Sequence, residues 1–225
     1  MKNRPKCACG QTADPQGYCD GSHAKKSTRK IMKKVKNTVL LSLSIIGILS
    51  LQSFRSEKNS LNNHEVKQSN IEWKAYKVTG SHKGNVTLKS GSLTFENDKL
   101  VGGSFTMDMT SITCTDLDGE YKNKLEGHLK SDDFFGVNKH ATSTLKLISV
   151  KSVGKNVYDV KGELTIKQIT KPIKFKVSVY GKKANASIKV DRTDFDIKYG
   201  SGSYFDDLAD NLIYDEFDLV VDLVF

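Results

Sequence analysis

The sequence predicts an all-β, mainly antiparallel domain that closes into a barrel of about eight strands with one short helix. Apolar and polar residues alternate with period two from Ile71 onward, and glycine-containing breaks separate the runs by hairpin-like distances. The last run is too apolar to remain an open sheet edge. We expect a membrane-spanning or signal helix and a small metal-binding segment to precede the barrel. We expect regions at residues 1–37, 38–54, 55–70 and 71–225.

The region 38–54, TVLLSLSIIGILSLQSF, has 17 residues and no charge. As a helix it would be roughly 26 Å long, marginal for a hydrocarbon core of about 30 Å. It follows a basic run and precedes a polar stretch, which is the order of an exported or anchored segment. We expect an inner-membrane protein with a cytoplasmic N-terminus and a periplasmic barrel, or a protein secreted to the periplasm if the segment is cleaved. Translation could start at Met1 or at Met32, because the segment from Met32 onward has the features of a complete signal peptide.

The net charge of +9 is concentrated at the N-terminus. Residues 1–37 hold ten Lys and Arg against Asp14 and Asp20, which gives +8 and leaves +1 for the rest of the chain. A basic tail beside an apolar span is explained by membrane topology and by anionic lipid head groups. We therefore expect a membrane partner and no nucleic-acid partner.

Three cysteines and a histidine lie close together before the apolar stretch: Cys7, Cys9, Cys19 and His23. Thiolates and imidazole suit zinc or an iron–sulfur cluster. The segment also resembles the CDGSH iron–sulfur family, through the C-x-C pair and the run Cys19-Asp-Gly-Ser-His23. The resemblance implies a [2Fe–2S] cluster held by these four residues, with zinc as the alternative. Because the segment is too short to bury a core alone, such a cluster would need a homodimer or another partner.

Beyond the polar region 55–70, expected to be a flexible linker, alternation marks each strand in turn. The clearest runs lie at residues 71–75, 173–179, 184–190 and 217–225. The final run predicts that the last strand reaches Phe225 and closes against the first. One stretch differs, since Tyr121, Leu125 and Leu129 recur at helical spacing. We expect a short helix there, covering one end of the barrel.

The polar residues of the barrel do not form a recognisable catalytic set. His82, His128 and His140 have no nucleophile beside them in sequence, and the aspartates of residues 206–215 fit a solvated loop better than a metal site. We expect no enzymatic activity. A closed sheet of eight strands is either filled by side chains or just wide enough for one slender ligand, and alternation does not separate these cases.

Three segments resemble recurrent segments of the YceI-like family, in order and at the usual separations: residues 127–135, 162–172 and 191–197. The resemblance covers residues 71–225. It implies a lipocalin-like barrel that binds polyisoprenoid or another long-chain amphiphile. The expected wall residues are Phe105, Met107, Phe134, Phe135, Phe175, Val177 and Leu219, and the expected head-group contacts are His82, Lys130 and Arg192.

Two alternatives stay open at this point. One is a membrane redox protein whose N-terminal [2Fe–2S] cluster exchanges electrons with a quinone-like ligand or a cytoplasmic partner. The other is an envelope stress or structural protein whose barrel is filled. Our first hypothesis is a non-catalytic, membrane-tethered barrel that carries or sequesters a lipid.

Overall fold

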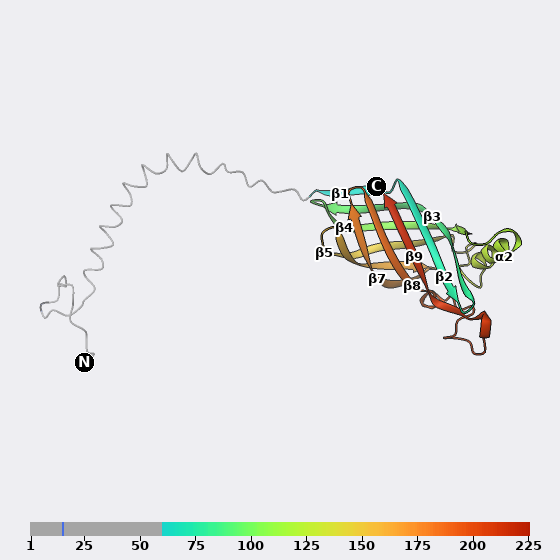
Figure 1. The fold of residues 1–225 in the computed structure, drawn as a ribbon. Coiled ribbons are helices and arrows are strands. Elements are labelled where there is room, and N and C mark those ends of the chain that lie inside the picture. The colour runs from blue at the N-terminus through green and yellow to red at the C-terminus, as the bar shows by residue number, and fades with distance from the viewer. Residues whose placement is uncertain (1–14, 16–59) are drawn as a thin grey trace. The chain divides into compact units, whose positions relative to one another are not determined.

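The computed structural model describes residue 15 and residues 60–225. From residue 60 onward these residues form nine strands, one α-helix and two short 3-10 helices (Figure 1). The strands are β1 (Leu61–Glu65), β2 (Gln68–Lys77), β3 (Gly80–Glu96), β4 (Lys99–Cys114), β5 (Thr142–Gly154), β6 (Val157–Ile166), β7 (Ile169–Tyr180), β8 (Lys183–Asp191) and β9 (Ile213–Val224). The helices are α2 (Gly119–Lys130), η1 (Arg192–Phe195) and η2 (Ala209–Asn211).

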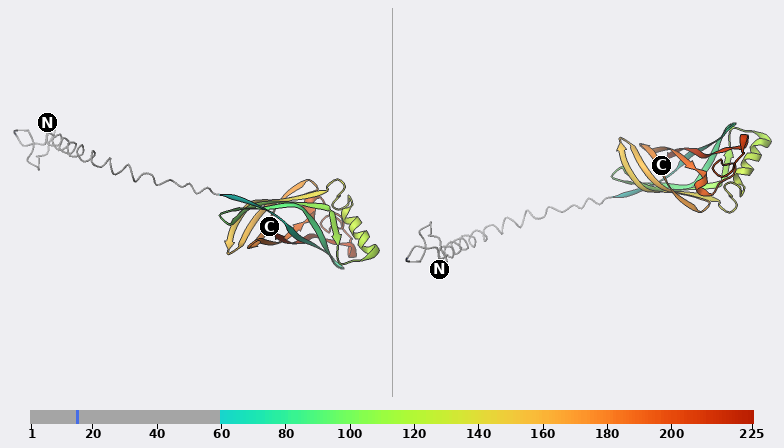
Figure 2. Two further views of the ribbon diagram at one scale, coloured as in Figure 1. Left: turned by 90° about the horizontal axis from the view of Figure 1, so that it is seen from above. Right: turned by 90° about the horizontal axis from the view of Figure 1, so that it is seen from below.

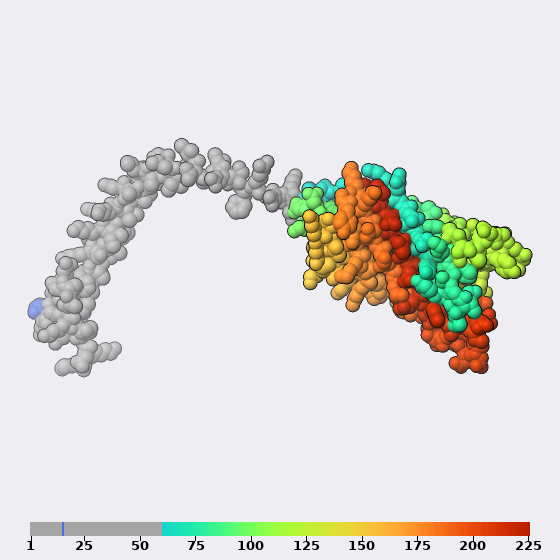
Figure 3. All heavy atoms as spheres, viewed as in Figure 1, coloured from blue at the N-terminus to red at the C-terminus, as the bar shows by residue number. Residues whose placement is uncertain are grey.

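Eight of these strands close into an antiparallel barrel. The order is β3-β2-β9-β8-β7-β6-β5-β4, and β4 pairs again with β3. The closed, all-β fold with one helix is therefore confirmed. The last strand closes against β2, with Ile71 opposite Val221, and also pairs with β8. Figure 3 shows β9 lying between β2 and the strands that precede it along the chain.

Strands begin earlier than predicted. Leu61–Glu65 and the first residues of β2 fall in the region that we expected to be a linker, so the expected start near Ile71 is corrected. All five residues of β1 are exposed, and their side chains therefore show no apolar alternation. The strand is held by backbone pairing with β3, from Leu61 opposite Glu96 to Glu65 opposite Ser92.

The short helix is confirmed as α2, and it lies at the end of the barrel away from β1 (Figures 1 and 2). Leu129 is its one buried residue, while Tyr121 is exposed. Gly127 lies inside the helix and does not interrupt it. The Glu126 carboxylate accepts a hydrogen bond from the backbone N–H of Cys114 at 2.8 Å, which ties the helix to the end of β4.

Two groups of buried side chains fill the two ends of the barrel. The group near α2 includes Phe134, Phe195 and Ile197. The group near β1 includes Leu93, Phe95, Val160, Leu223 and Phe225, and the Phe95 and Phe225 rings stack with centroids 5.4 Å apart. Phe225 follows the last residue of β9, and its N–H donates to the Lys182 carbonyl at 3.0 Å.

Among the residues that the structure describes, no helix has both the length and the hydrophobicity that a membrane span requires. The predicted span at residues 38–54 lies outside the described residues and stays a prediction.

Candidate functional site

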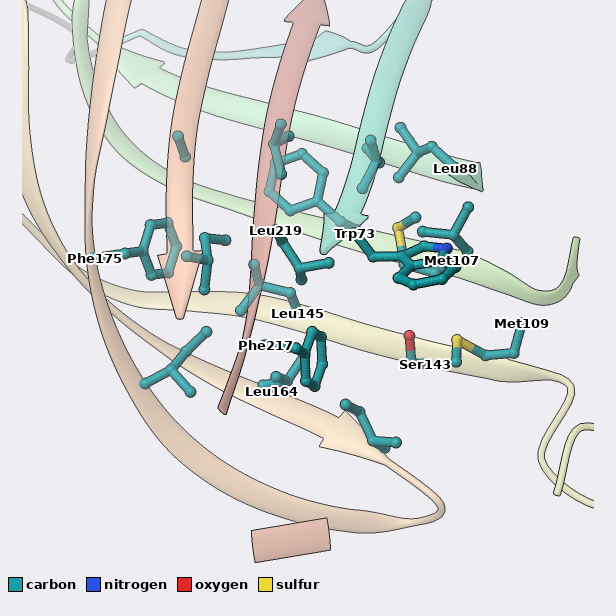
Figure 4. Close-up of a pocket in the computed structure, with 18 of the residues that line it drawn as sticks. Trp73, Leu88, Met107, Met109, Ser143, Leu145, Leu164, Phe175, Phe217 and Leu219 are labelled. Atoms are coloured by element: carbon teal, nitrogen blue, oxygen red, sulfur yellow. The ribbon is translucent and has the colours of Figure 1, made fainter. Parts of the chain in front are cut away.

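A cavity of about 160 Å³ lies inside the barrel (Figure 4). Every barrel strand contributes an apolar wall residue, and one from each is Trp73, Leu88, Met107, Leu145, Leu164, Phe175, Ala186 and Leu219. Side chains of the α2 end, such as Phe134 and Phe135, complete the lining. Holding one water takes about 10–15 Å³ of such space, so the cavity has room for on the order of ten groups of that size.

The cavity exists because large and small residues alternate around the inner face of the barrel. Ala184 and Ala186 of β8 point inward beside larger neighbours on adjacent strands, with Ala184 opposite Val179 and Leu223. A short side chain leaves its part of the interior open, since the backbone of a closed barrel cannot collapse inward. The interior is therefore packed at both ends and open between them.

Two buried polar side chains reach the cavity wall. Ser143 of β5 is 5% exposed and lies opposite Met107 of β4, and its hydroxyl points toward the cavity (Figure 4). Arg192 of η1 is 2% exposed. Ser143 puts a polar group into an otherwise apolar lining, so its hydroxyl is a natural hydrogen-bonding point for an oxygen of a bound molecule.

The Arg192 guanidinium is used in hydrogen bonds within the protein. It donates hydrogen bonds to the backbone carbonyls of Ile197 at 2.8 Å, Ile213 at 2.9 Å and Tyr214 at 3.2 Å, and it lies 3.4 Å from the Asp215 carboxylate. Burial lowers the pKa of Arg192, and the neighbouring carboxylates oppose that shift. These bonds fix the connection between β8 and β9 at the α2 end of the cavity.

The structure brings most of the predicted site residues together. The seven predicted wall residues, Phe105, Met107, Phe134, Phe135, Phe175, Val177 and Leu219, all line the cavity, as does Arg192. His82 and Lys130 do not. Lys130 ends α2, where its carbonyl accepts a hydrogen bond from Val137.

His82 belongs to a separate polar cluster at the end of β4. Its Nδ1 lies 2.9 Å from the Asp116 carboxylate, which also accepts hydrogen bonds from the Lys83 N–H and the Cys114 thiol. Burial acts to raise the pKa of Asp116, but these hydrogen bonds outweigh it and lower the pKa to about 2. Burial also raises the pKa of the Cys114 thiol, with a further contribution from its hydrogen bond to Asp116.

Several wall residues were missed by the sequence prediction. Trp73 lines the cavity and donates its indole N–H to the Thr113 carbonyl at 3.1 Å. Ser143 was missed as well, although it shares an alternating face with Leu145 and Leu147. That alternation places Ser143 on the inner face and is the signal that could have found it.

The predicted metal ligands Cys7, Cys9, Cys19 and His23 lie outside the described residues. Within residues 60–225, no group of three or more His, Cys, Asp or Glu side chains is arranged to hold a metal ion. The cluster, or zinc in its place, stays a prediction.

Comparison with known proteins agrees with this architecture. The YceI-like domain matches residues 63–225. The chain belongs to the YceI-like family. Among its relatives, a UPF0312 protein of Vibrio parahaemolyticus is 27% identical over 135 residues, which is 55% of this chain and 69% of that protein. A UPF0312 protein of Ectopseudomonas mendocina is 46% identical over 46 residues, covering 20% of this chain and 24% of the relative.

Two solved structures share the YceI-like fold. BcnA of Burkholderia cenocepacia aligns with a TM-score of 0.57 at 20% identity, covering 70% of this chain and 96% of BcnA. A domain from Saccharophagus degradans aligns with a TM-score of 0.51 at 15% identity, covering 73% of this chain and 99% of that domain. The latter is described as a polyisoprenoid binding domain implicated in plant cell wall breakdown.

Proposed function

We propose that this YceI-like barrel binds the apolar chain of one long-chain amphiphile, of polyisoprenoid or fatty type, and carries or sequesters it without chemical change. The observation that supports this most is the cavity of about 160 Å³, which has an almost wholly apolar lining. An apolar cavity of this kind stays dry and favours an apolar guest. The Saccharophagus domain, which shares the fold, is described as polyisoprenoid binding.

The volume sets the scale of the affinity. Burying about ten methylene-sized groups at about 0.8 kcal/mol each gives roughly 8 kcal/mol before the entropic cost of binding is subtracted. Only part of a long isoprenoid therefore fits in the cavity, and the remainder with the head group stays outside it. The open interior also argues against the alternative of a completely filled barrel.

We further propose that the barrel acts in the periplasm, held to the inner membrane or secreted. The support comes from the order of basic run, apolar stretch and polar stretch at residues 25–70. A lipid carrier outside the cytoplasm is exposed to membrane surfaces from which an apolar chain can be taken up. Determining the N-terminus of the mature protein in the membrane fraction tests this assignment.

The binding proposal is tested by extracting the purified full-length protein with organic solvent and identifying lipids by mass spectrometry. We expect an isoprenoid or fatty chain in about one copy per protein. A protein that carries no lipid, and that takes up neither farnesol nor an isoprenoid quinone when these are added, would contradict the proposal.

A further inference from the structure

The strand ladder along the edge of β3 is interrupted over one stretch, which we call the opening between β2 and β3. Residues 72–77 of β2 pair with residues 80–85 of β3, and β1 pairs with residues 92–96 of the same strand. Residues 66–71 lie between β1 and the paired part of β2, and residues 86–91 lie between the corresponding parts of β3. The two stretches have equal length, so the β1–β3 and β2–β3 ladders share one register. In the described barrel, no strand pairing joins these two stretches.

The bonds that cross the opening lie at its two ends. At one end the Val66 N–H donates to the Gly91 carbonyl at 2.9 Å. At the other end the Asn85 amide donates to Asn70 at 3.2 Å and to the Ile71 carbonyl at 3.5 Å. Between these points β2 pairs with β9 on its other edge, and β3 pairs with β4.

Two register shifts in β3 explain why the strands separate. The β3–β4 ladder shifts register between Asn85 and Thr87, and again between Leu88 and Ser90. Such bulges bend a strand and increase its twist, which here turns β3 away from β2. The backbone groups that face the opening need water as a partner, because a buried and unpaired peptide group is costly.

One position on the inner face of the barrel, Ser69, is exposed at this opening. Ser69 lies directly opposite Leu223 and on the same side of β2 as Ile71. Leu223 and Ile71 line the cavity. Residues directly opposite in an antiparallel pair point to the same face of the sheet. Ser69 is nevertheless exposed. Across the opening, Val86 and Leu88 of β3 also line the cavity.

A polar depression of about 370 Å³ lies at the β1 end of the opening. Its polar border comes from one cationic residue, one acidic residue and several neutral ones: Lys89, Glu65, Asn63, Ser90, Ser92, Ser104 and Thr106. Gly91 separates it from the interior, and the Phe105 ring lies 2.7 Å from the place that a Gly91 Cβ would occupy. A polar surface therefore adjoins the apolar cavity at this point.

Both ends of the barrel are filled by buried side chains. The Phe95 and Phe225 rings stack beside His64 at the β1 end. At the α2 end, the Phe134 ring lies 5.7 Å from the guanidinium carbon of Arg192, and it belongs to the same core cluster as the buried Phe195. Entry through either end would displace packed aromatic rings, whereas entry between β2 and β3 breaks no strand ladder.

We propose that the opening between β2 and β3 is a lateral portal, through which the apolar chain of an amphiphile enters the cavity while its polar head group stays in the depression beside Gly91. This rests on the proposed lipid-binding function. The chain passes between Ser69 on one side and Leu88 on the other. The hydroxyl residues of the depression retain the head group at the surface through hydrogen bonds.

The test measures uptake of dansyl-labelled undecanoic acid by stopped-flow fluorescence. The variant Ser69→Phe places a ring in the portal, and Ser187→Phe is the control, since Ser187 is an exposed residue of β8 in the intact ladder opposite Val220. We expect Ser69→Phe to slow both association and release at least about tenfold, because a blocked route changes rates in both directions. The control should match the wild-type protein.

A second variant closes the portal reversibly. Gln68→Cys with Lys89→Cys places two thiols at exposed positions that the shared register of the flanking ladders puts opposite each other, and a bifunctional methanethiosulfonate reagent joins them. Cys7, Cys9 and Cys19 are replaced by serine throughout, and the fully buried Cys114 is left in place. Cross-linking should slow uptake, and reduction should restore it. The same cross-link between Ser187→Cys and Val220→Cys should have no effect.

The results of these experiments distinguish a failure of the portal proposal from a failure of the lipid-binding proposal. If the wild-type protein takes up the probe and both portal variants do so at unchanged rates, the portal is wrong and the chain enters at an end of the barrel. If the wild-type protein takes up neither this probe nor farnesol, the lipid-binding function itself is contradicted, and the portal with it. Circular dichroism and thermal unfolding establish that each variant is folded.

Discussion

At the scale of single residues, the wall of the cavity was predictable and its polar contacts were not. Residues such as Phe105 and Phe175 line the cavity because alternation fixes the inner face of each strand. A charged residue carries no such signal. Arg192 and His82 were predicted to contact a head group. The N–H groups of Arg192 instead donate to backbone carbonyls, and His82 is paired with Asp116. Such contacts depend on distances between loops that periodicity does not encode.

Arg192 should be important for stability. We expect Arg192→Met to lower the free energy of unfolding by about 3–5 kcal/mol, because it leaves buried carbonyls of Ile197 and Ile213 without a donor. Lys130→Met is the control and should change stability by less than about 0.5 kcal/mol. Urea unfolding measures both. Equal stability of the two variants would show that the guanidinium bonds do not hold the connection between β8 and β9.

Asp116 should make stability depend on pH in the acid range. Its pKa is lowered to about 2 in the folded protein, so the carboxylate stabilises the fold above its unfolded pKa, near 4. This contribution should be lost as the pH falls from about 4 through 2. Asp116→Asn should remove that part of the pH dependence, as followed by urea unfolding at several pH values. Asp118→Asn is the control, since the Asp118 side chain makes no capping hydrogen bond.

At the scale of elements, the strands and the helix followed from periodicity, and the exceptions have physical reasons. α2 was found because Leu125 and Leu129 recur at helical spacing, whereas β1 was missed because its residues are exposed and held only by backbone pairing. The opening between β2 and β3 was likewise not predictable from the sequence. It depends on where two bulges fall in β3, and side-chain patterns do not locate an interruption in a hydrogen-bond ladder.

Two glycines should respond in opposite directions to the same change. In Gly84→Ala, the new methyl group would overlap the Thr113 carbonyl and lie 2.8 Å from the Trp73 ring. We expect a loss of about 1–3 kcal/mol or more in unfolding free energy. Gly127 lies inside α2 with nothing within 4 Å of its Cβ position. Gly127→Ala should therefore stabilise the protein by up to about 1 kcal/mol. Thermal unfolding of the two variants checks the sign of each effect.

At the scale of the whole molecule, closure of the barrel was predictable from one feature. A final strand as apolar as residues 217–225 requires partners on both edges, and it has them in β2 and β8. The open interior was not predictable, because it depends on the summed volumes of side chains such as Ala186 and Trp73 around a closed ring. The N-terminal segment and the apolar stretch lie outside the described residues, so their predicted roles rest on the sequence.

The N-terminal motif makes a prediction that is independent of the barrel. If Cys7, Cys9, Cys19 and His23 hold a [2Fe–2S] cluster, the purified full-length protein should show visible absorbance that Cys19→Ser abolishes. Metal analysis distinguishes the alternatives, since a zinc-loaded protein is colourless. A colourless, iron-free protein would reject the cluster and leave lipid binding by the barrel unaffected.

The most direct test of the account is the number of farnesol molecules bound per chain, measured by native mass spectrometry for the wild-type protein and for Ala186→Phe. The inward-facing ring of the variant fills the cavity without adding a charge or removing a strand bond. We predict one bound molecule for the wild-type protein and none for the folded variant. Equal binding by both proteins would contradict the claim that the interior of the barrel holds the chain.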